Sequence, residues 1–248
     1  MSDAATQPTA AVLLIGNELL SGKTQDANLQ FFGIELAKLG IRLEEARVVR
    51  DVADAIVAHL NELRAKHTYV FTTGGIGPTH DDITAECVAR AFGVELVLDE
   101  EAVRRLRAGR YELNEARLKM ARVPRGATLI DNAVSLAPGF RIGNVFVLAG
   151  IPAIARAMFA AAAPQLTSGA TIHSGSVDVL LREGDIAMPL ERIALAHPEV
   201  EIGSYPFRRG ETFGATLVVR GTDPDLIARV LEEIKAAMRE IGGDAALG

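Results

Sequence analysis

The residues of this sequence best suited to chemistry form a glycine-rich stretch with two adjacent aspartates. Residues 72–86 read Thr-Thr-Gly-Gly-Ile-Gly-Pro-Thr-His-Asp-Asp-Ile-Thr-Ala-Glu. Glycines let a backbone approach a ligand closely, and a helix that begins after such a turn directs free N–H groups at an anion. The carboxylates of Asp81 and Asp82 are suited to binding Mg²⁺ or orienting a water molecule beside a phosphate. The stretch therefore predicts a phosphate site that uses a metal ion.

The flanking residues predict the elements that hold this stretch. Residues 68–71, Thr-Tyr-Val-Phe, favour a strand. After the aspartates, apolar residues recur at helical spacing until Gly93 ends the pattern, namely Ile83, Cys87, Ala91 and Phe92. The sequence therefore predicts a strand, a glycine turn and a helix in succession, with Cys87 buried as a small apolar residue.

The first 165 residues alternate between strand and helix patterns. Strands are expected at 11–15, 41–49, 68–73, 94–98 and 144–148, and helices at 28–39, 53–66, 99–121 and 152–163. Such alternation predicts an α/β fold with a parallel sheet, in which ligands bind beyond the carboxyl ends of the strands. Acidic residues follow three of the predicted strands, at Glu18, Asp51 and the Asp81–Asp82 pair.

A second, smaller domain is expected after a short stretch rich in Pro, Thr, Ser and Gly at 164–169. Strand and helix patterns then follow in the order β-α-β-β-α, with a hairpin turn at Arg208-Arg209-Gly210 and a terminal helix at 224–241. This order predicts a small α+β domain of split-βαβ type. We therefore divide the chain into residues 1–165 and 166–248.

Composition narrows the class of protein. The chain has 248 residues, a formal net charge of −6 and a single cysteine. One cysteine allows no internal disulfide and suits a reducing cytoplasm. No apolar run is long enough to cross a membrane, and no signal peptide is visible. The negative charge argues against binding to duplex nucleic acid, so we expect a cytoplasmic protein with a small-molecule ligand.

Several of these residues also have ordinary structural explanations. Either Asp81 or Asp82 can cap the helix that follows, which leaves the other free, and Asp51 can cap a helix that starts near Val52. Glu18 can be a solvated loop acid, and His80 can be a base, a phosphate donor or a surface residue. The basic residues around 114–125 can be a solvated helix face or can supply cations to a diphosphate. A nucleotide-binding P-loop at Gly22-Lys23-Thr24 is excluded because Asn17 stands where the motif needs its first glycine.

Thr72–Ala85 closely resembles the signature of the molybdopterin-binding (MoaB/Mog-like) fold, and in particular the amino-terminal domain of the competence/damage-inducible protein A (CinA) family. Further similarities are spread over about the first 160 residues. They are Gly16–Gly22, Asp51, Asn114 to Ala127, Pro138–Phe140 and Gly150–Pro152. Only about 80 residues follow the 164–169 stretch, which is short for the amidase domain of long relatives, so we expect a form without that activity.

This resemblance implies a three-layer α/β fold and a site for a nucleotide or a pterin. It implies Asp51, Asp81 and Asp82 as catalytic acids, with Asp81 and Asp82 holding a divalent metal (Mg, Co or Mn). The substrate and phosphate contacts that it implies are Gly16, Glu18, Ser21, Gly74, Gly75, Gly77, Thr79, Pro138 and Gly139. Three activities stay open, namely hydrolysis of ADP-ribose or a similar diphosphate, adenylylation of molybdopterin, and binding of a pterin or nucleotide without turnover. The resemblance also implies a homo-oligomer, either a dimer or a trimer.

Overall fold

The computed structural model describes residues 7–109 and 112–247. It consists of two compact units, Met1–Gly169 and Ala170–Gly248, which are described separately below. The division follows Gly169, four residues beyond the predicted boundary, because the backbone of Gly169 still donates a hydrogen bond to Leu39 of the first unit.

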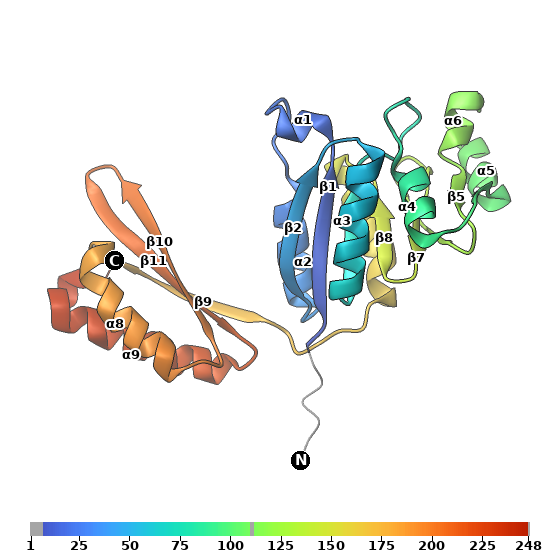
Figure 1. Cartoon of the computed structure of the whole chain (residues 1–248). Coiled ribbons are helices and arrows are strands. Elements are labelled where there is room, and N and C mark those ends of the chain that lie inside the picture. Colours follow the sequence, from blue (N-terminus) through green and yellow to red (C-terminus); the bar gives the residue numbers. More distant parts are fainter. Residues whose placement is uncertain (1–6, 110–111, 248) are drawn as a thin grey trace, which may run out of the picture. The chain divides into compact units, whose positions relative to one another are not determined.

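The first unit is built on a six-stranded sheet with the order β2-β1-β3-β8-β7-β6 (Figure 1). Strands β2, β1, β3 and β8 run parallel, whereas β7 is antiparallel to β8 and β6 is antiparallel to β7. The strands are β1 Thr9–Ile15, β2 Arg42–Val49, β3 Tyr69–Thr73, β6 Thr128–Ile130, β7 Gly139–Ile142 and β8 Val145–Leu148. The prediction of a mostly parallel sheet is confirmed, and four carboxyl ends meet at one edge.

Helices cover both faces of this sheet, which gives the three layers expected. Residues of β1 alternate between two cores, because successive side chains of a strand point to opposite faces. Val12 and Leu14 pack with helices α2 and α7, whereas Leu13 and Ile15 pack with α3 and α4. The four helices are α2 Asn28–Lys38, α3 Ala53–Lys66, α4 Thr84–Phe92 and α7 Pro152–Ala162. Cys87 of α4 is buried as predicted, and burial raises the pKa of its thiol to about 11.

The single helix expected over 99–121 is wrong. Two short helices occupy this stretch, α5 Glu100–Arg107 and α6 Glu115–Lys119, and residues 110 and 111 between them lie outside the described residues. Side chains of Asp99 and Asn114 cap the two helices, and such caps mark helix starts. A two-stranded sheet of β4 Leu96–Leu98 and β5 Arg122–Pro124 flanks this pair. A short helix, α1 Asn17–Leu20, follows β1, and a 3₁₀ turn at Ala163–Gln165 follows α7.

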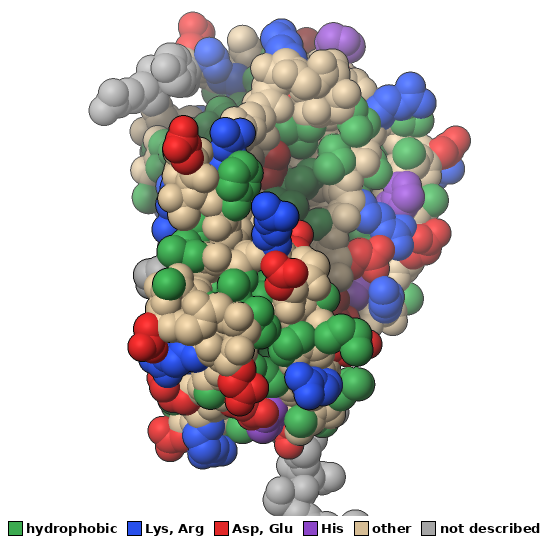
Figure 2. Space-filling model, turned by 90° about the vertical axis from the view of Figure 1, so that its left-hand side faces the viewer, with side chains coloured by type: hydrophobic (Ala, Val, Ile, Leu, Met, Phe, Trp, Pro, Cys, Tyr) green, Lys and Arg blue, Asp and Glu red, His purple; other side chains and the backbone are tan. Residues whose placement is uncertain are grey.

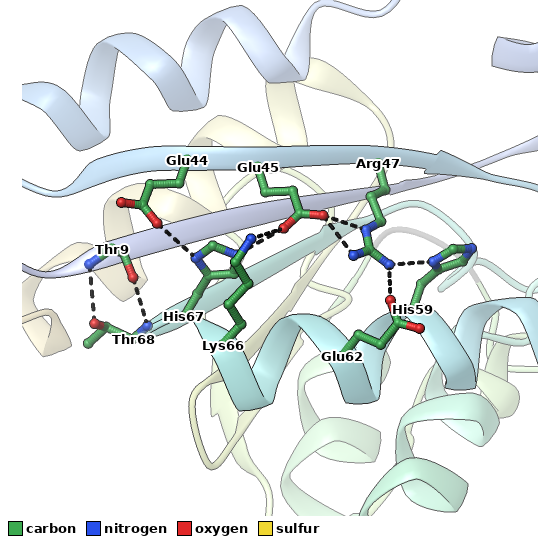
Figure 3. Close-up of polar contacts among 9 residues, drawn as sticks. All are labelled: Thr9, Glu44, Glu45, Arg47, His59, Glu62, Lys66, His67 and Thr68. Atoms are coloured by element: carbon green, nitrogen blue, oxygen red, sulfur yellow. Dashed lines mark hydrogen bonds and ion pairs between the residues drawn. The ribbon is translucent and has the colours of Figure 1, made fainter.

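A network of charged side chains joins edge strand β2 to the end of α3 (Figure 3). The carboxylate of Glu45 accepts hydrogen bonds from Arg47 at 2.7 Å and from Lys66 at 2.9 Å. The buried ring of His67 lies 3.3 Å from the same carboxylate, and the Arg47 guanidinium also contacts His59. His59 and His67 therefore have structural roles in this network.

The second unit has the predicted order of strands and helices, β9 His173–Val179, α8 Glu183–Ala196, β10 Glu201–Arg209, β11 Thr212–Gly221 and α9 Pro224–Gly242. The sheet order is β10-β11-β9, with β11 antiparallel to both neighbours. Both helices contribute to one core against this sheet (Figure 1). Near the end of the chain, a 3₁₀ turn at Asp244–Ala246 packs against α9, and Ala246 is buried. The small α+β domain is therefore confirmed.

Acidic and basic side chains are interspersed on the face shown in Figure 2, so this face has no broad area of one charge among the described residues. None of the helices in the described part of the chain combines the length and the hydropathy that a membrane span requires.

Candidate functional site

A cavity of about 1080 Å³ lies at the carboxyl edge of the six-stranded sheet. Its lining includes nine of the predicted site residues, which come from the ends of three strands, namely Gly16, Glu18, Asp51, Gly74, Gly75, Gly77, Thr79, Asp81 and Asp82. The cavity therefore brings together residues that are up to 66 positions apart in the sequence, and it is the candidate functional site.

The glycine turn after β3 cannot accept side chains. Gly74 and Gly75 have φ angles of 101° and 67°, in the left-handed region that favours glycine. A Cβ atom at Gly74 would lie 2.1 Å from the carbonyl oxygen of Ile15, and one at Gly75 would lie 2.2 Å from Oγ1 of Thr84. At Gly77 a Cβ atom would lie 2.6 Å from a carboxylate oxygen of Asp82. Gly74 and Gly75 are therefore required by the packing of the turn itself, whereas a side chain at Gly77 would require the Asp82 carboxylate to move.

The carbonyl groups of Gly74, Gly75 and Thr79 are hydrogen-bonded, whereas the described residues provide no partner for three consecutive amide groups of the turn. Thr84, at the start of α4, donates from its hydroxyl to Gly74 and from its amide to Gly75, both at 2.9 Å. Lys119 of α6 donates to the carbonyl of Thr79 at 2.8 Å. The N–H groups of residues 75–77 have no hydrogen-bond partner among the described residues. Successive free amides in such a turn form a concave site for an anion.

The two aspartates after the turn do not cap the helix that follows. Helix α4 begins at Thr84, and its N-cap residue, Ile83, makes no side-chain cap. Asp82 instead accepts hydrogen bonds from the amide of Thr79, at 2.8 Å, and from its hydroxyl. Hydrogen bonding with Thr79 is also the main cause that lowers the pKa of Asp81. The capping alternative is therefore wrong for both residues, and both carboxylates line the cavity.

Asp51 and Glu18 lie at the neighbouring strand ends β2 and β1. The carboxylate of Asp51 accepts a hydrogen bond from the amide of Asn17 at 2.8 Å, and α3 begins without a side-chain cap. The expectation that Asp51 caps this helix is therefore wrong, because Asp51 binds the turn after β1 instead. The carboxylate of Glu18 folds over Gly16, where a Cβ atom would lie 2.4 Å from its Oε1 atom. A side chain at Gly16 would therefore require the Glu18 carboxylate to move.

The acidic residues fit a divalent cation only in part. Within the described ranges, no group of three or more His, Cys, Asp or Glu side chains is arranged to hold a metal ion. One oxygen of Asp82 is already bonded to Thr79, and one of Asp51 to Asn17. Mg²⁺ is commonly bound through one or two carboxylates together with phosphate oxygens of a substrate. Asp81 and Asp82 can act as such a partial ligand set.

The opposite side of the cavity is apolar. It is formed by the loop after β6, the turn after β8 and helix α7, and its side chains include Ala133, Val134, Leu136, Ile151, Ile154 and Met158. Leu136 has a φ angle of 63°, in the left-handed region that a leucine seldom adopts. The buried side chain of Asn132 fixes this loop, because it donates to Ser135 and Ala137 and accepts from the amides of Val134 and Ser135.

Four predicted or open residues do not line the cavity. Ser21 is exposed beside α1, where its hydroxyl donates to the carbonyl of Glu18. Pro138 lines a small neighbouring pocket of about 20 Å³. Gly139 is buried in β7, where a Cβ atom would lie 2.5 Å from the carbonyl oxygen of Val147, so packing explains this glycine. The side chain of His80 is 97% exposed and lies 3.9 Å from Asp81.

Sequence reasoning missed Thr84, whose hydroxyl holds the glycine turn, as well as Val134, Leu136 and Ile151. Threonine is common near helix starts, so its presence there gave no specific signal. Two of the basic residues between 114 and 125 lie at the site rather than on a solvated helix face. Arg117 lines the cavity, and Lys119 donates a hydrogen bond to the glycine turn.

In α/β proteins, anionic ligands are commonly bound where a glycine turn with unbonded amides lies at the carboxyl edge of the sheet, and the described residues place such a turn beside acidic side chains. The chain belongs to the family described as "Probable molybdopterin binding domain", whose model matches residues 11–168. Residues 171–242 match a second model, the middle domain of FAD synthase.

Individual relatives agree with this assignment. A protein of Aeropyrum pernix is 34% identical over 258 residues and covers 95% of this chain and 96% of its own length. A CinA-like protein of Citrifermentans bemidjiense is 45% identical over 150 residues, which are 57% of this chain and 36% of that protein. The crystal structure of CinA from Thermoplasma acidophilum has 34% identity and a TM-score of 0.60, and covers 63% of this chain and 98% of that one. The resemblance to CinA is therefore confirmed.

Proposed function

We propose that this protein is a metal-dependent hydrolase of a nucleoside diphosphate compound, with ADP-ribose as the first candidate. The observation that carries the proposal is the row of three amides at 75–77, which have no partner in the described part of the chain, with carboxylates on the same turn. Amides in this arrangement bind the oxygens of a diphosphate and stabilise the charge that develops when its bond breaks. The resemblance to CinA supplies the choice of ADP-ribose.

In this proposal each residue of the turn has a distinct task. Gly75 and Gly77 present their amides to the diphosphate, and Thr79 holds Asp82 in place. Asp81 and Asp82 hold the cation together with oxygens of the substrate. A divalent cation held there, which can be Mg²⁺, Co²⁺ or Mn²⁺, would supply neutralisation of the charge on the phosphates. Asp51 orients a water molecule, whose oxygen forms a new bond to one phosphorus while the bridging P–O bond breaks. The products are AMP and ribose 5-phosphate.

The test is incubation of the purified protein with ADP-ribose and each of the three cations, with AMP release measured by chromatography. We expect AMP in the presence of a cation and none in EDTA. Asp82→Asn keeps an oxygen that can accept from Thr79 but removes the charge, so turnover should fall by about a hundredfold or more. Asp54→Asn is a matched control, because Asp54 is an exposed aspartate paired with Arg90 and does not line the cavity.

The other two activities give different results in the same experiment. Binding of ADP-ribose or of a pterin without any product would favour a binding module, and formation of adenylylated molybdopterin from ATP would favour the transferase. Unchanged turnover in Asp82→Asn would remove this residue from the mechanism. Assembly as a dimer or trimer remains part of the proposal, and light scattering of the intact chain measures it.

A further inference from the structure

Apart from residues of α7 and of the segment from Leu106 to Met120, the residues that line the cavity follow the order of the strands in the sheet. Asp51 follows β2, Glu18 follows β1, and the glycine turn follows β3. The turn 149–152 follows β8, and the loop 132–137 joins β6 to β7. Neighbouring strands lie about 4.8 Å apart, so the six strands extend over roughly 24 Å with the glycine turn third in the row. The anion site therefore has one flank across β1 and β2 and another across β8, β7 and β6.

The β1–β2 flank is rich in hydrogen-bond acceptors. The side chain of Glu18 has no hydrogen bond or ion pair within the described part of the chain, and one oxygen of Asp51 is likewise without a partner there. Two carboxylates on adjacent strand ends repel a further anionic group but accept hydrogen bonds from hydroxyl groups. Thr24 adds a hydroxyl to this part of the lining. This flank therefore suits the sugar of a ligand.

The β8–β6 flank is apolar and partly uncovered. Val134 and Ile151 line the cavity and are 58% and 61% exposed, so both present aliphatic surface at the opening. The donors and acceptors of Asn132 are used within its own loop, and the hydroxyl of Ser135 accepts from Asn132. This flank therefore offers mainly apolar contact beside the hydroxyl of Ser135, which suits the face of a flat ring.

We propose that the cavity binds nucleoside diphosphate sugars in one orientation, with the diphosphate on the glycine turn, the base across β8–β6 and the sugar across β1–β2. Glu18 selects for the sugar and Ile151 contacts the base. This inference rests on the function proposed above, since it assigns the two arms of the same ligand. It also gives a role to Glu18, a cavity carboxylate that the proposed hydrolysis does not use.

Calorimetric titration in EDTA tests the orientation without hydrolysis, with ADP-ribose, ADP and inorganic pyrophosphate as ligands. We expect affinity to fall in that order for the unaltered chain. Ile151→Thr should lower the affinity for ADP-ribose and for ADP by about fourfold, since it removes about one methyl contact with the base. The affinity for pyrophosphate should stay unchanged. Glu18→Gln should weaken ADP-ribose by about tenfold and leave ADP and pyrophosphate unchanged, because a charged acceptor for the sugar hydroxyls is lost.

Leu98→Thr is the matched control, because Leu98 is 53% exposed and does not line the cavity. The orientation would be overturned if Glu18→Gln lowered the affinity for ADP as much as the affinity for ADP-ribose. Loss of pyrophosphate binding in Ile151→Thr would overturn it as well. Failure of ADP-ribose to bind in EDTA would also overturn it, while AMP release with a cation would still uphold the proposed hydrolysis. Conversely, the expected binding pattern without any AMP release supports the orientation and overturns only the hydrolysis.

Discussion

The ammonium group of Lys119 donates a hydrogen bond to the carbonyl of Thr79 at 2.8 Å. This bond joins α6 to the end of the glycine turn, 40 residues earlier in the chain. Thr79 in turn donates a hydrogen bond to Asp82. The position of the Asp82 carboxylate in the cavity therefore depends on helix α6.

We therefore expect Lys119→Met to weaken the site without unfolding the protein. Methionine keeps most of the aliphatic stem but cannot donate to Thr79, so the turn loses one of the bonds that orient it. Affinity for ADP-ribose should fall by about fivefold, as expected for a lost hydrogen bond of about 1 kcal/mol. Titration calorimetry measures the affinity, and Lys38→Met, remote from the cavity on α2, is the control. Equal affinities in both variants would show that the Lys119 bond has no part in binding.

Removal of the Thr84 hydroxyl should affect stability and binding together. Thr84→Val keeps the shape of the side chain but leaves the buried carbonyl of Gly74 without this donor, at a cost of about 1–3 kcal/mol. Thr84→Ser retains the hydroxyl and should restore both the denaturation midpoint and the affinity for pyrophosphate. If serine rescues neither property, the hydroxyl is not what holds the turn.

Comparing substitutions at two glycines with nearly equal φ angles distinguishes the cost of backbone strain from the cost of a steric contact. Gly75 has a φ angle of 67° and Gly93 one of 65°, yet a Cβ atom at Gly93 meets nothing within 4 Å. Gly93→Ala should therefore cost about 1 kcal/mol, the cost of a left-handed residue with a side chain. Gly75→Ala should be clearly more destabilising and should abolish pyrophosphate binding. Similar unfolding free energies for the two variants would contradict the contact with Thr84.

The network around Glu45 predicts an acid-sensitive first unit. Hydrogen bonds from Lys66, Arg47 and His67, in that order of importance, lower the pKa of Glu45 from 4.5 to about 2. A pKa that is lower in the folded state gives stability that is present above pH 4.5 and is lost as the pH falls towards 2.

Urea unfolding followed by circular dichroism between pH 6 and pH 2.5 measures this loss. Glu45→Gln should unfold at lower urea than the unaltered chain at pH 6, and the difference between them should shrink below pH 4.5. Glu240→Gln is the control, because Glu240 has no ion pair within the residues that the structure describes. A difference that stays constant with pH would show that the charge of Glu45 does not stabilise the fold.

Hydrophobic periodicity was sufficient to predict the layers of the fold. The strand that ends at Ile15 and the helix from Ala53 were predicted correctly, because each buries a regular set of apolar residues against the sheet. The 99–121 segment was not predicted correctly, because its charged residues favour a helix throughout whereas Asn114 starts a second one. The side-chain cap at Asn114 thus marks a helix start that the periodicity of the segment does not indicate.

The candidate site was predictable only where glycine and acidic residues stood close together in the chain. The residues from Gly74 to Asp82 were found because their types are unusual in this combination. Val134, Leu136 and Ile151 have common apolar side chains, and only the pairing of β6, β7 and β8 places them beside the glycine turn. The hydrogen bond between Asp51 and the amide of Asn17 could not be predicted from the sequence either, because it depends on the parallel register of β1 and β2.

A Cβ atom at Gly150 would lie 3.2 Å from Cα of Gly74, so the main chains of the turns after β3 and β8 touch. The side chain of Asn28 also holds Gly150, by a hydrogen bond to its carbonyl at 2.8 Å. Substitution of Gly74 or Gly150 is therefore restricted, so a change of ligand preference is not expected to arise at either position. We expect variation among relatives with different preferences to concentrate at residues 133–136 and at Ile151, where new shapes can be tried without disturbing the scaffold.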